Sequence, residues 1–155
     1  WCEINDLVNR VVQVLKQELD QHKLEVEISH EMPLVRLDFG LMEHVIYNLL
    51  LNSCQYSPPG SLIRFVSDYN QGFLFITIED TGPGFSPEML DKVFNKFFRA
   101  DNQKPGGLGL GLSIVRGLVE AHKGNVTVEN KPEGGAKFTI SIPTEIPDME
   151  KISLE

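Results

Sequence analysis

The sequence has 155 residues with 14 basic and 22 acidic side chains, which gives a formal net charge of −8. A chain of this length is expected to form one domain with its own hydrophobic core. The acidic balance argues against a general nucleic-acid binder or an anionic-membrane binder, because such proteins neutralise phosphates with basic surfaces. No apolar run approaches the roughly 18–20 residues that cross a bilayer, and no signal peptide opens the chain.

The first residue and the two cysteines bear on whether the chain is part of a longer protein and on its redox compartment. The chain opens on Trp1 without an initiator Met, so we expect an excised part of a longer protein. Cys2 and Cys54 match no metal-binding spacing, and a lone pair so far apart is weak evidence for a disulfide. We therefore expect two free thiols in a reducing cytoplasm.

The first third of the chain alternates between helical and extended patterns. Apolar residues recur at helical spacing over 4–22, and residues 24–28 alternate strictly as a half-buried strand. Residues 34–37 predict a second, short strand. Asp38 is then expected to cap a helix that runs to about Ser57, where a Ser-Pro-Pro-Gly sequence ends it.

A β-hairpin and a segment with few core signals make up the middle of the chain. Residues 62–68 and 73–79 are expected to pair antiparallel around a turn, and the apolar run at the start of the second is typical of a buried strand. Ser86 and Pro87 then begin a predicted short helix that residues 94–99 continue. The polar, glycine-rich residues that follow favour a mobile lid. The phenylalanines of 94–99 could belong to the core or anchor this lid.

The last third predicts one helix and two strands. The helix covers residues 111–122 and ends at a Lys-Gly pair, and a strand follows at 125–129. A glycine turn then leads into a strand over 136–142 that ends at a proline. The acidic, polar residues 144–155 are expected to form a tail.

Two asparagines on the helix after Asp38 are candidate ligands. Asn48 and Asn52 stand one helical turn apart and therefore share a face in an otherwise apolar stretch. Such a pair simply faces solvent in many helices, and that alternative stays open. Two amide oxygens on one face are also suitable ligands for Mg²⁺, which prefers oxygen and keeps part of its water shell.

Two glycine motifs point to a nucleotide. In the sequence Asp80-Thr81-Gly82-Pro83-Gly84, an acidic residue ends a strand just before a turn, where it can accept a hydrogen bond from the exocyclic amine of adenine. In residues 107–113, glycines at every second position lead into a helix. Free N–H groups and the positive end of the helix dipole at that point suit a phosphate.

The set of motifs, in this order, resembles the catalytic and ATP-binding domain of sensor histidine kinases, within the ATPase group that includes DNA gyrase, heat-shock chaperones and MutL proteins. The resemblance covers nearly the whole chain. Its boxes are matched in sequence order by residues 48–52 (N box), 80–84 (G1), 94–99 (F), 107–113 (G2) and 134–138 (G3).

The resemblance implies an α+β fold, a two-layer α/β sandwich of the Bergerat type. A mixed, mostly antiparallel sheet would carry helices on one face, and ATP would lie between a helix and the lid. The domain would span residues 1–143, with its lid at about 85–108 and a polar tail at 144–155.

The resemblance also implies the site residues. Asp80 would receive the adenine amine, Asn52 would bind Mg²⁺, and Asn48 would lie near the phosphates. Arg99, at the end of the F box, is a candidate for the lid arginine that meets the γ-phosphate, although a salt-bridged surface arginine is an open alternative. The full set of implied nucleotide contacts is Asn48, Asn52, Gln55, Tyr56, Asp80, Gly82, Gly84, Phe85, Gly107, Leu108, Gly109, Leu110, Gly111, Leu112 and Thr139.

One position favours phosphate transfer over hydrolysis. Hydrolysing relatives carry a glutamate general base four residues before the Mg²⁺-binding asparagine, and Asn48 stands there in this chain. An amide cannot accept the proton, so water activation should be poor. Glu43 could assist, but an exposed helix carboxylate is the simpler interpretation.

The expected partners are therefore a phosphoacceptor helical-hairpin domain of the same parent chain and a response regulator, with no nucleic acid and no direct membrane contact. The fragment is expected to be a cytoplasmic domain of a membrane-associated parent. His30 lies in a sequence that resembles a phosphoacceptor box, but the breakers around it predict a plain loop histidine.

Two other functions stay open. A serine-directed anti-sigma-factor kinase of the same group is disfavoured by the F box and the long lid. A degenerate nucleotide-sensing or docking module without kinase activity is kept open by Gln55, because the N box usually carries Lys or Arg there.

We expect Gln55→Lys to tighten ATP binding. A restored cation that contacts phosphate should contribute about 1–2 kcal/mol if the contact is charge-assisted. Calorimetric titration of the two proteins with ATP measures the difference. A Gln55→Lys variant that binds no tighter would contradict the idea.

Overall fold

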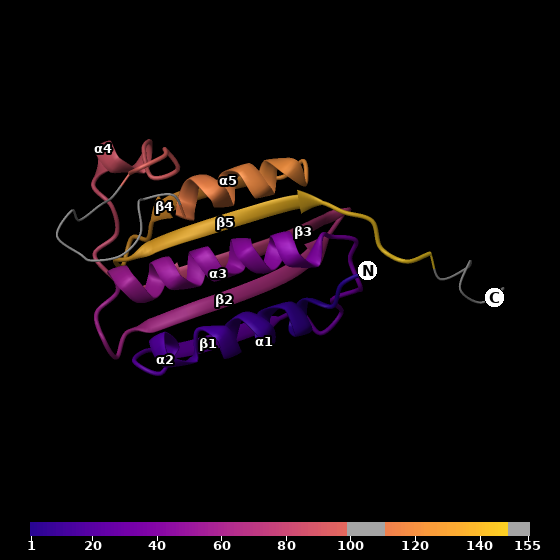
Figure 1. Ribbon diagram of the computed structural model, residues 1–155, viewed down its shortest axis with the longest axis horizontal. Coiled ribbons are helices and arrows are strands. Elements are labelled where there is room, and N and C mark those ends of the chain that lie inside the picture. The colour runs from indigo at the N-terminus through magenta and orange to yellow at the C-terminus, as the bar shows by residue number, and fades with distance from the viewer. Residues whose placement is uncertain (99–110, 149–155) are drawn as a thin grey trace.

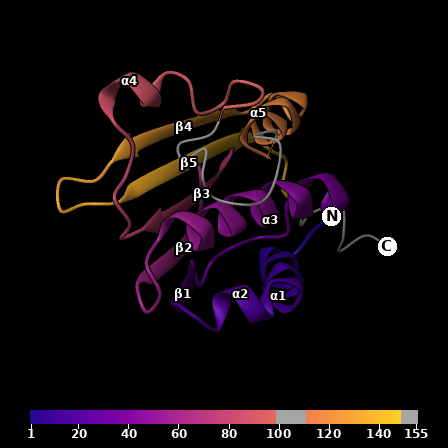
Figure 2. The ribbon, with the colours of Figure 1, turned by 60° about the vertical axis from the view of Figure 1, so that its left-hand side comes forward.

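The computed structural model describes residues 1–98 and 111–148, which form two layers, with a β-sheet on one side and helices on the other (Figures 1 and 2). This confirms the predicted α+β sandwich with helices on one face of the sheet. The strands are β1 (Lys23–Ile28), β2 (Leu62–Asn70), β3 (Phe73–Asp80), β4 (Asn125–Asn130) and β5 (Ala136–Pro143). The helices are α1 (Ile4–Val14), α2 (Lys16–Leu19), α3 (Phe39–Tyr56), α4 (Pro87–Leu90) and α5 (Gly111–Ala121).

The sheet has five strands in the order β1-β2-β3-β5-β4. β1 and β2 are parallel, and the other three pairs are antiparallel. Because parallel neighbours need a crossover, α3 passes over the sheet between β1 and β2. The predicted hairpin is confirmed, and its turn places Gln71 and Gly72 at φ values of 50° and 85°. Two such residues in succession match the twist of the strands they join.

The core lies between the sheet and three helices. Alternate residues of β2, β3 and β5 are buried beneath α1, α3 and α5, as a sheet covered on one face requires. The prediction of a buried strand at the start of β3 therefore holds for only one of its two faces. Phe73 and Phe75 point to the uncovered face, where they are 42% and 37% exposed.

The first predicted helix is interrupted. Leu15, with φ −97° and ψ 19°, separates α1 from α2. Leu15 and Leu19 are nevertheless buried, so the apolar pattern continues beyond the end of α1. The cap position of α1 is Glu3, whose side chain makes no capping bond.

The short strand predicted at 34–37 is also wrong. This segment makes one isolated bridge, in which the backbones of Val35 and Cys2 exchange hydrogen bonds of 2.7 Å and 3.0 Å. The cap of α3 follows at Asp38 and leaves no room for a longer strand. The first residues of the expected tail contact the same segment. Thr144 Oγ1 accepts from the Arg36 N–H and donates to its carbonyl, and the Glu145 carboxylate pairs with the Arg36 guanidinium.

Residues 94–98 form turns and do not continue α4, contrary to the prediction. Phe97 has φ 65°, which a right-handed helix cannot accommodate. The other boundaries agree with prediction: α5 ends before Lys123, which has φ 60°, and His30 is exposed in a turn after β1. Among the described residues, no helix combines the length and the apolar character that a membrane crossing demands.

We expect Asp38→Ala to lower the free energy of unfolding by about 1 kcal/mol, because its carboxylate accepts a 3.0 Å hydrogen bond from the Leu41 N–H at the start of α3. For a domain of this size the melting temperature should fall by about 2–4 °C. Thermal unfolding followed by circular dichroism measures the change. Glu120→Ala, an exposed acidic position of α5, is the matched control and should change stability by less than about 0.5 kcal/mol.

Candidate functional site

Asp80 is a buried carboxylate at the end of β3. The alternation of the strand directs it to the side of the sheet that the helices cover, and it is 5% exposed. Its Oδ1 accepts hydrogen bonds from the N–H of Gly82 at 2.9 Å and of Ala136 at 3.2 Å. No residue of the described ranges donates to Oδ2. Among the described residues, one oxygen of Asp80 is therefore held by backbone and the other has no donor.

The turn after β3, residues 80–85, is closely packed against its surroundings. We call it the Asp80 turn. A methyl group on Gly82 would lie 2.6 Å from the carbonyl oxygen of Tyr56, the last residue of α3. Gly84 has φ 72°, and Gly135, with φ 95°, lies so close that a methyl group there would overlap the Asp80 carbonyl oxygen. Only glycine allows these approaches without a shift of backbone.

The two asparagines of α3 are half-buried, and Asn48 lies beside the start of α5. Asn48 Nδ2 donates to the carbonyl of His44 at 2.9 Å. Its Oδ1 faces the first residue of α5, since a methyl group on Gly111 would lie 2.9 Å from that oxygen. A side chain at position 111 would therefore displace the amide, and glycine keeps α3 and α5 in close contact.

The structure brings together some of the predicted nucleotide contacts. Tyr56, Asp80, Gly82 and Gly84 meet around the Asp80 turn, and Asn48 meets Gly111. Phe85 and Leu112 are buried, Asn52 is half-buried, and Gln55 is exposed on α3. The predictions at Arg99, Gly107, Leu108, Gly109 and Leu110 lie outside the described residues.

Thr139 lies apart from this group. Its neighbours Phe138 and Ile140 are buried under the helices, so Thr139 points to the opposite face of the sheet, paired with Thr77 and Thr127. The β5 residue that reaches Asp80 is Ala136, which sequence reasoning missed. The glycine pair before Ala136 could have indicated this contact, because it allows the chain to pass close to the Asp80 backbone.

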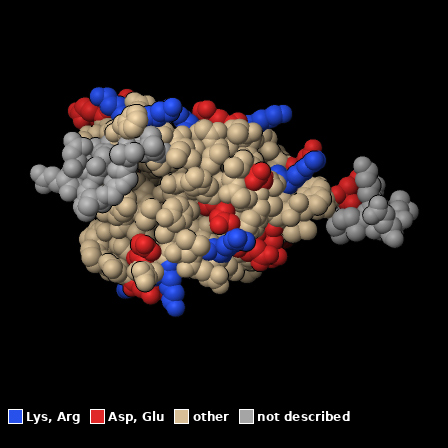
Figure 3. Space-filling view, in the orientation of Figure 1, with Lys and Arg blue, Asp and Glu red and all other residues tan. Residues whose placement is uncertain are grey.

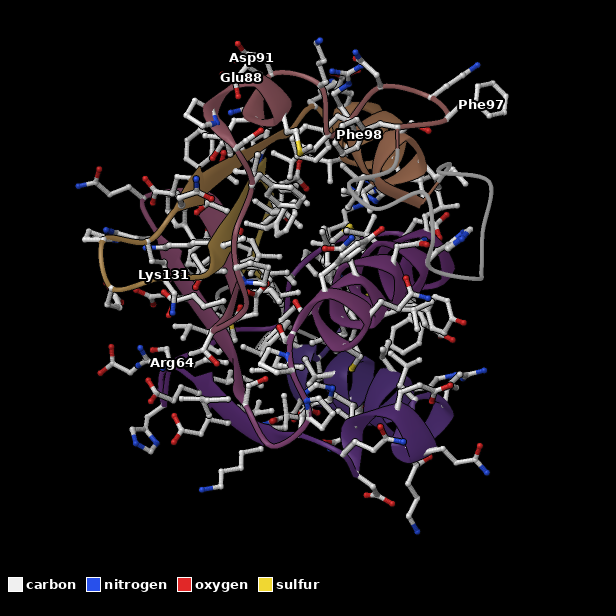
Figure 4. All side chains as sticks on the ribbon, turned by 90° about the vertical axis from the view of Figure 1, so that its left-hand side faces the viewer. Arg64, Glu88, Asp91, Phe97, Phe98 and Lys131 are labelled. Carbon is white, nitrogen blue, oxygen red and sulfur yellow. The ribbon has the colours of Figure 1, made fainter. Side chains whose placement is uncertain are left out.

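The described part of the predicted lid rests on β5. The rings of Phe85 and Phe94 both contact Phe138 edge to face, with centroids 6.3 Å and 6.1 Å away. Phe97 is 67% exposed and projects from the body of the domain (Figure 4). The core interpretation of the phenylalanine cluster therefore holds for Phe94 and not for Phe97.

A hollow lies between α1 and α3. Its volume is about 270 Å³, and it is lined by Val11, Val14, Gly40, Glu43, His44 and Tyr47. Glu43 does not stand free there, because the Arg10 guanidinium lies 3.1 Å from its carboxylate. Much of the face that α1, α3 and α5 form is uncharged, but acidic and basic side chains lie together near its centre as well as along its rim (Figure 3).

Cys54 is a poor candidate for thiol chemistry. Partial burial, and secondarily the charge of Glu18, raise the pKa of its thiol to about 11. The thiolate is the reactive form, so this side chain stays protonated at neutral pH. Within residues 1–98 and 111–148, no cluster of three or more His, Cys, Asp or Glu side chains could hold a metal ion.

Known proteins are similar to this chain in sequence and in fold. The family described as histidine kinase-, DNA gyrase B-, and HSP90-like ATPase matches residues 38–146. The sensor protein KdpD of Clostridium acetobutylicum is 34% identical over 148 residues, which are 92% of this chain and 16% of that protein. The sensor histidine kinase WalK of Bacillus subtilis is 30% identical over 152 residues, 92% of this chain and 24% of that protein. The chain thus spans a small part of both relatives.

Among solved structures, the catalytic domain of the histidine kinase ThkA superimposes with a TM-score of 0.82 at 26% identity. The match covers 92% of this chain and 93% of that one, so both layers of the sandwich are shared.

We expect Gly82→Ala to destabilise the domain by about 1–3 kcal/mol, because the added methyl group meets backbone at 2.6 Å and the Asp80 turn must shift. Gly117→Ala is the matched control. Gly117 is exposed within α5 and has no neighbour within 4 Å of the new methyl group, so this variant should gain about 0.5–1 kcal/mol from helix propensity. Urea unfolding measures the free energy of unfolding of both variants, which should fall for Gly82→Ala and rise for Gly117→Ala. Equal effects would contradict the tight packing of Gly82.

Proposed function

The chain belongs to the histidine kinase-, DNA gyrase B-, and HSP90-like ATPase family, and we propose from this that it is the ATP-binding catalytic domain of a two-component sensor histidine kinase. It binds Mg-ATP between α3, the Asp80 turn and the start of α5. It then transfers the γ-phosphate to a histidine on a separate helical-hairpin domain of the parent chain, for relay to a response regulator. The observation that carries the proposal is the buried Asp80 carboxylate.

Adenine fits the free side of Asp80. Two backbone N–H groups fix Oδ1, so Oδ2 has a defined direction and is the acceptor for the exocyclic amine of the base. The hydrogen bond is charge-assisted and lies at a site that is 5% exposed, where few waters compete.

The phosphates extend toward α3 and α5. α5 begins at Gly111, and a helix of 11 residues directs its first N–H groups and a positive dipole end to that point. Asn48 Oδ1 faces the same point. The amide oxygen of Asn52, one turn along α3, is a hard ligand of the kind that Mg²⁺ accepts together with phosphate and water. When bound there, Mg²⁺ supplies neutralisation of the phosphate charge.

The residues of α3 favour transfer over hydrolysis. Asn48 occupies the position of a general base, and its Nδ2 already donates to the His44 carbonyl. An amide takes no proton from water, so the site aligns the γ-phosphate without activating a water molecule. The ring nitrogen of the incoming histidine forms the new bond to phosphorus as the bond to the β-phosphate oxygen breaks and ADP leaves.

Calorimetric titration of the domain with ATP, with and without Mg²⁺, tests the proposal. We expect micromolar binding that depends on Mg²⁺. No detectable heat up to millimolar nucleotide would contradict it and would favour a docking module that keeps the glycine motifs as scaffold.

Asp80→Asn is expected to weaken ATP binding about 10- to 100-fold, because it removes a hydrogen bond to a charged acceptor and can place an NH₂ group against the amine of the base. The fold should persist, since an Asn oxygen can still accept from Gly82 and Ala136. Calorimetry and thermal unfolding measure the two effects separately. Asp20→Asn, at the exposed end of α2, is the matched control and should bind ATP as the wild type does.

A further inference from the structure

The last residue of β4, Asn130, holds the backbone of the Asp80 turn with its side chain. Its Oδ1 accepts from the Phe85 N–H at 2.9 Å, and its Nδ2 donates to the Phe85 carbonyl at 2.5 Å. One carboxamide thus satisfies both backbone groups of a single residue, as a neighbouring strand would. A carboxylate in its place has only acceptors at neutral pH and could make one of the two bonds.

This contact also explains the glycine next to Phe85. Gly84 has φ 72°, and a methyl group there would lie 2.6 Å from Asn130 Oδ1. Asn130 can therefore reach the Phe85 backbone only past a residue without a side chain. The Phe85 ring is 8% exposed and contacts Phe138, so the held residue is anchored on both its backbone and its side chain.

The two ends of the Asp80 turn are held by one cross-strand pair. Asn130 on β4 and Ala136 on β5 are register partners. Ala136 donates its N–H to Asp80 at the beginning of the turn, and Asn130 binds Phe85 at its end. The distance across the turn is therefore set by the β4–β5 hairpin.

That hairpin is itself braced. The Lys131 N–H donates to the Gly135 carbonyl at 2.8 Å, and the Gly134 N–H donates back to Lys131 at 3.0 Å. The Lys131 ammonium lies 4.0 Å from the Glu79 carboxylate and 3.9 Å from that of Glu133. Figure 4 shows Lys131 on the side of the sheet that faces away from the helices. The end of β4 that carries Asn130 is therefore held by contacts on the face of the sheet opposite the helices.

The geometry points to Asn130 as a positioning residue for the nucleotide, an inference that rests on the proposed function. It holds the Asp80 turn in the shape that receives the base, and it acts through Phe85 and Gly84. Its effect should therefore appear in nucleotide affinity and in the local opening of the turn.

The test compares Asn130→Ala and Asn130→Asp with the wild type, and uses Asn125→Ala at the exposed start of β4 as the matched control. Calorimetry gives the dissociation constant for ATP, and hydrogen exchange by NMR gives the opening rate at the Phe85 amide. For Asn130→Ala we expect ATP binding about tenfold weaker and Phe85 exchange at least about tenfold faster, as for one lost hydrogen bond. Asn130→Asp keeps an acceptor for the Phe85 N–H and loses the donor to the Phe85 carbonyl, so its Phe85 exchange should rise less than in Asn130→Ala while ATP binding still weakens. The control should match the wild type in both.

A second pair of variants protects the test against a general loss of stability. Gly84→Ala is made in the wild type and in Asn130→Ala. The new methyl group meets Asn130 Oδ1 only in the first background, whereas the backbone strain at φ 72° is common to both. We expect Gly84→Ala to weaken ATP binding less when Asn130 is absent, the coupling that contact residues show.

The contrary outcomes bear on two claims, the positioning role of Asn130 and the proposed function. Unchanged Phe85 exchange in Asn130→Ala, equal ATP affinity despite faster exchange, or strictly additive effects of Gly84 and Asn130 would each overturn the positioning role. A wild-type domain that binds no ATP would overturn the proposed function and this role with it, and the wild-type titration alone identifies that case.

Discussion

A buried carboxylate is the constraint on which this end of the fold depends. Asp80 is 5% exposed, so its charge must be compensated by hydrogen bonds. Oδ1 obtains them from Gly82, two residues along the chain, and from Ala136, at the start of β5. The first bond requires a tight turn after β3, and the second fixes where β5 begins. The close approaches at Gly82 and Gly135 follow from these two bonds.

The rest of the site is built on ends of regular elements. β3 ends at Asp80, β5 begins at Ala136 and α5 begins at Gly111, while Asn48 lies within α3. The apolar face of α3 packs into the core with Leu49 and Leu50 fully buried, and this packing presents the Asn48 amide to α5. The core therefore positions the Asn48 amide.

Much of this arrangement could be predicted from the sequence, because it depends on local patterns. The Asp80 motif, the cap at Asp38 and the hairpin at 71–72 are each encoded within a few residues. The side of the sheet to which Thr139 points was also encoded, since Thr139 alternates with the apolar Phe138 and Ile140. Similarity to known motifs nevertheless suggested a nucleotide contact for Thr139, which this alternation does not allow. The contacts of Ala136 and Asn130 could not be predicted, because they depend on which strands become neighbours in the sheet.

Because side chains alternate along a strand, the neighbours of the site residues point to the opposite face of the sheet, and they also stabilise the site. Next to Asp80, Asn130 and Ala136 stand Glu79, Lys131 and Lys137, which point to the opposite face. The Glu79 carboxylate lies 4.0 Å from Lys131 and 3.8 Å from Lys137, and the side chains of Glu79 and Lys131 are only 19% and 11% exposed. Pairs so sheltered are screened less than surface pairs, and loss of one partner leaves a poorly hydrated charge. The uncovered face of the sheet therefore constrains the same three strand ends that form the site.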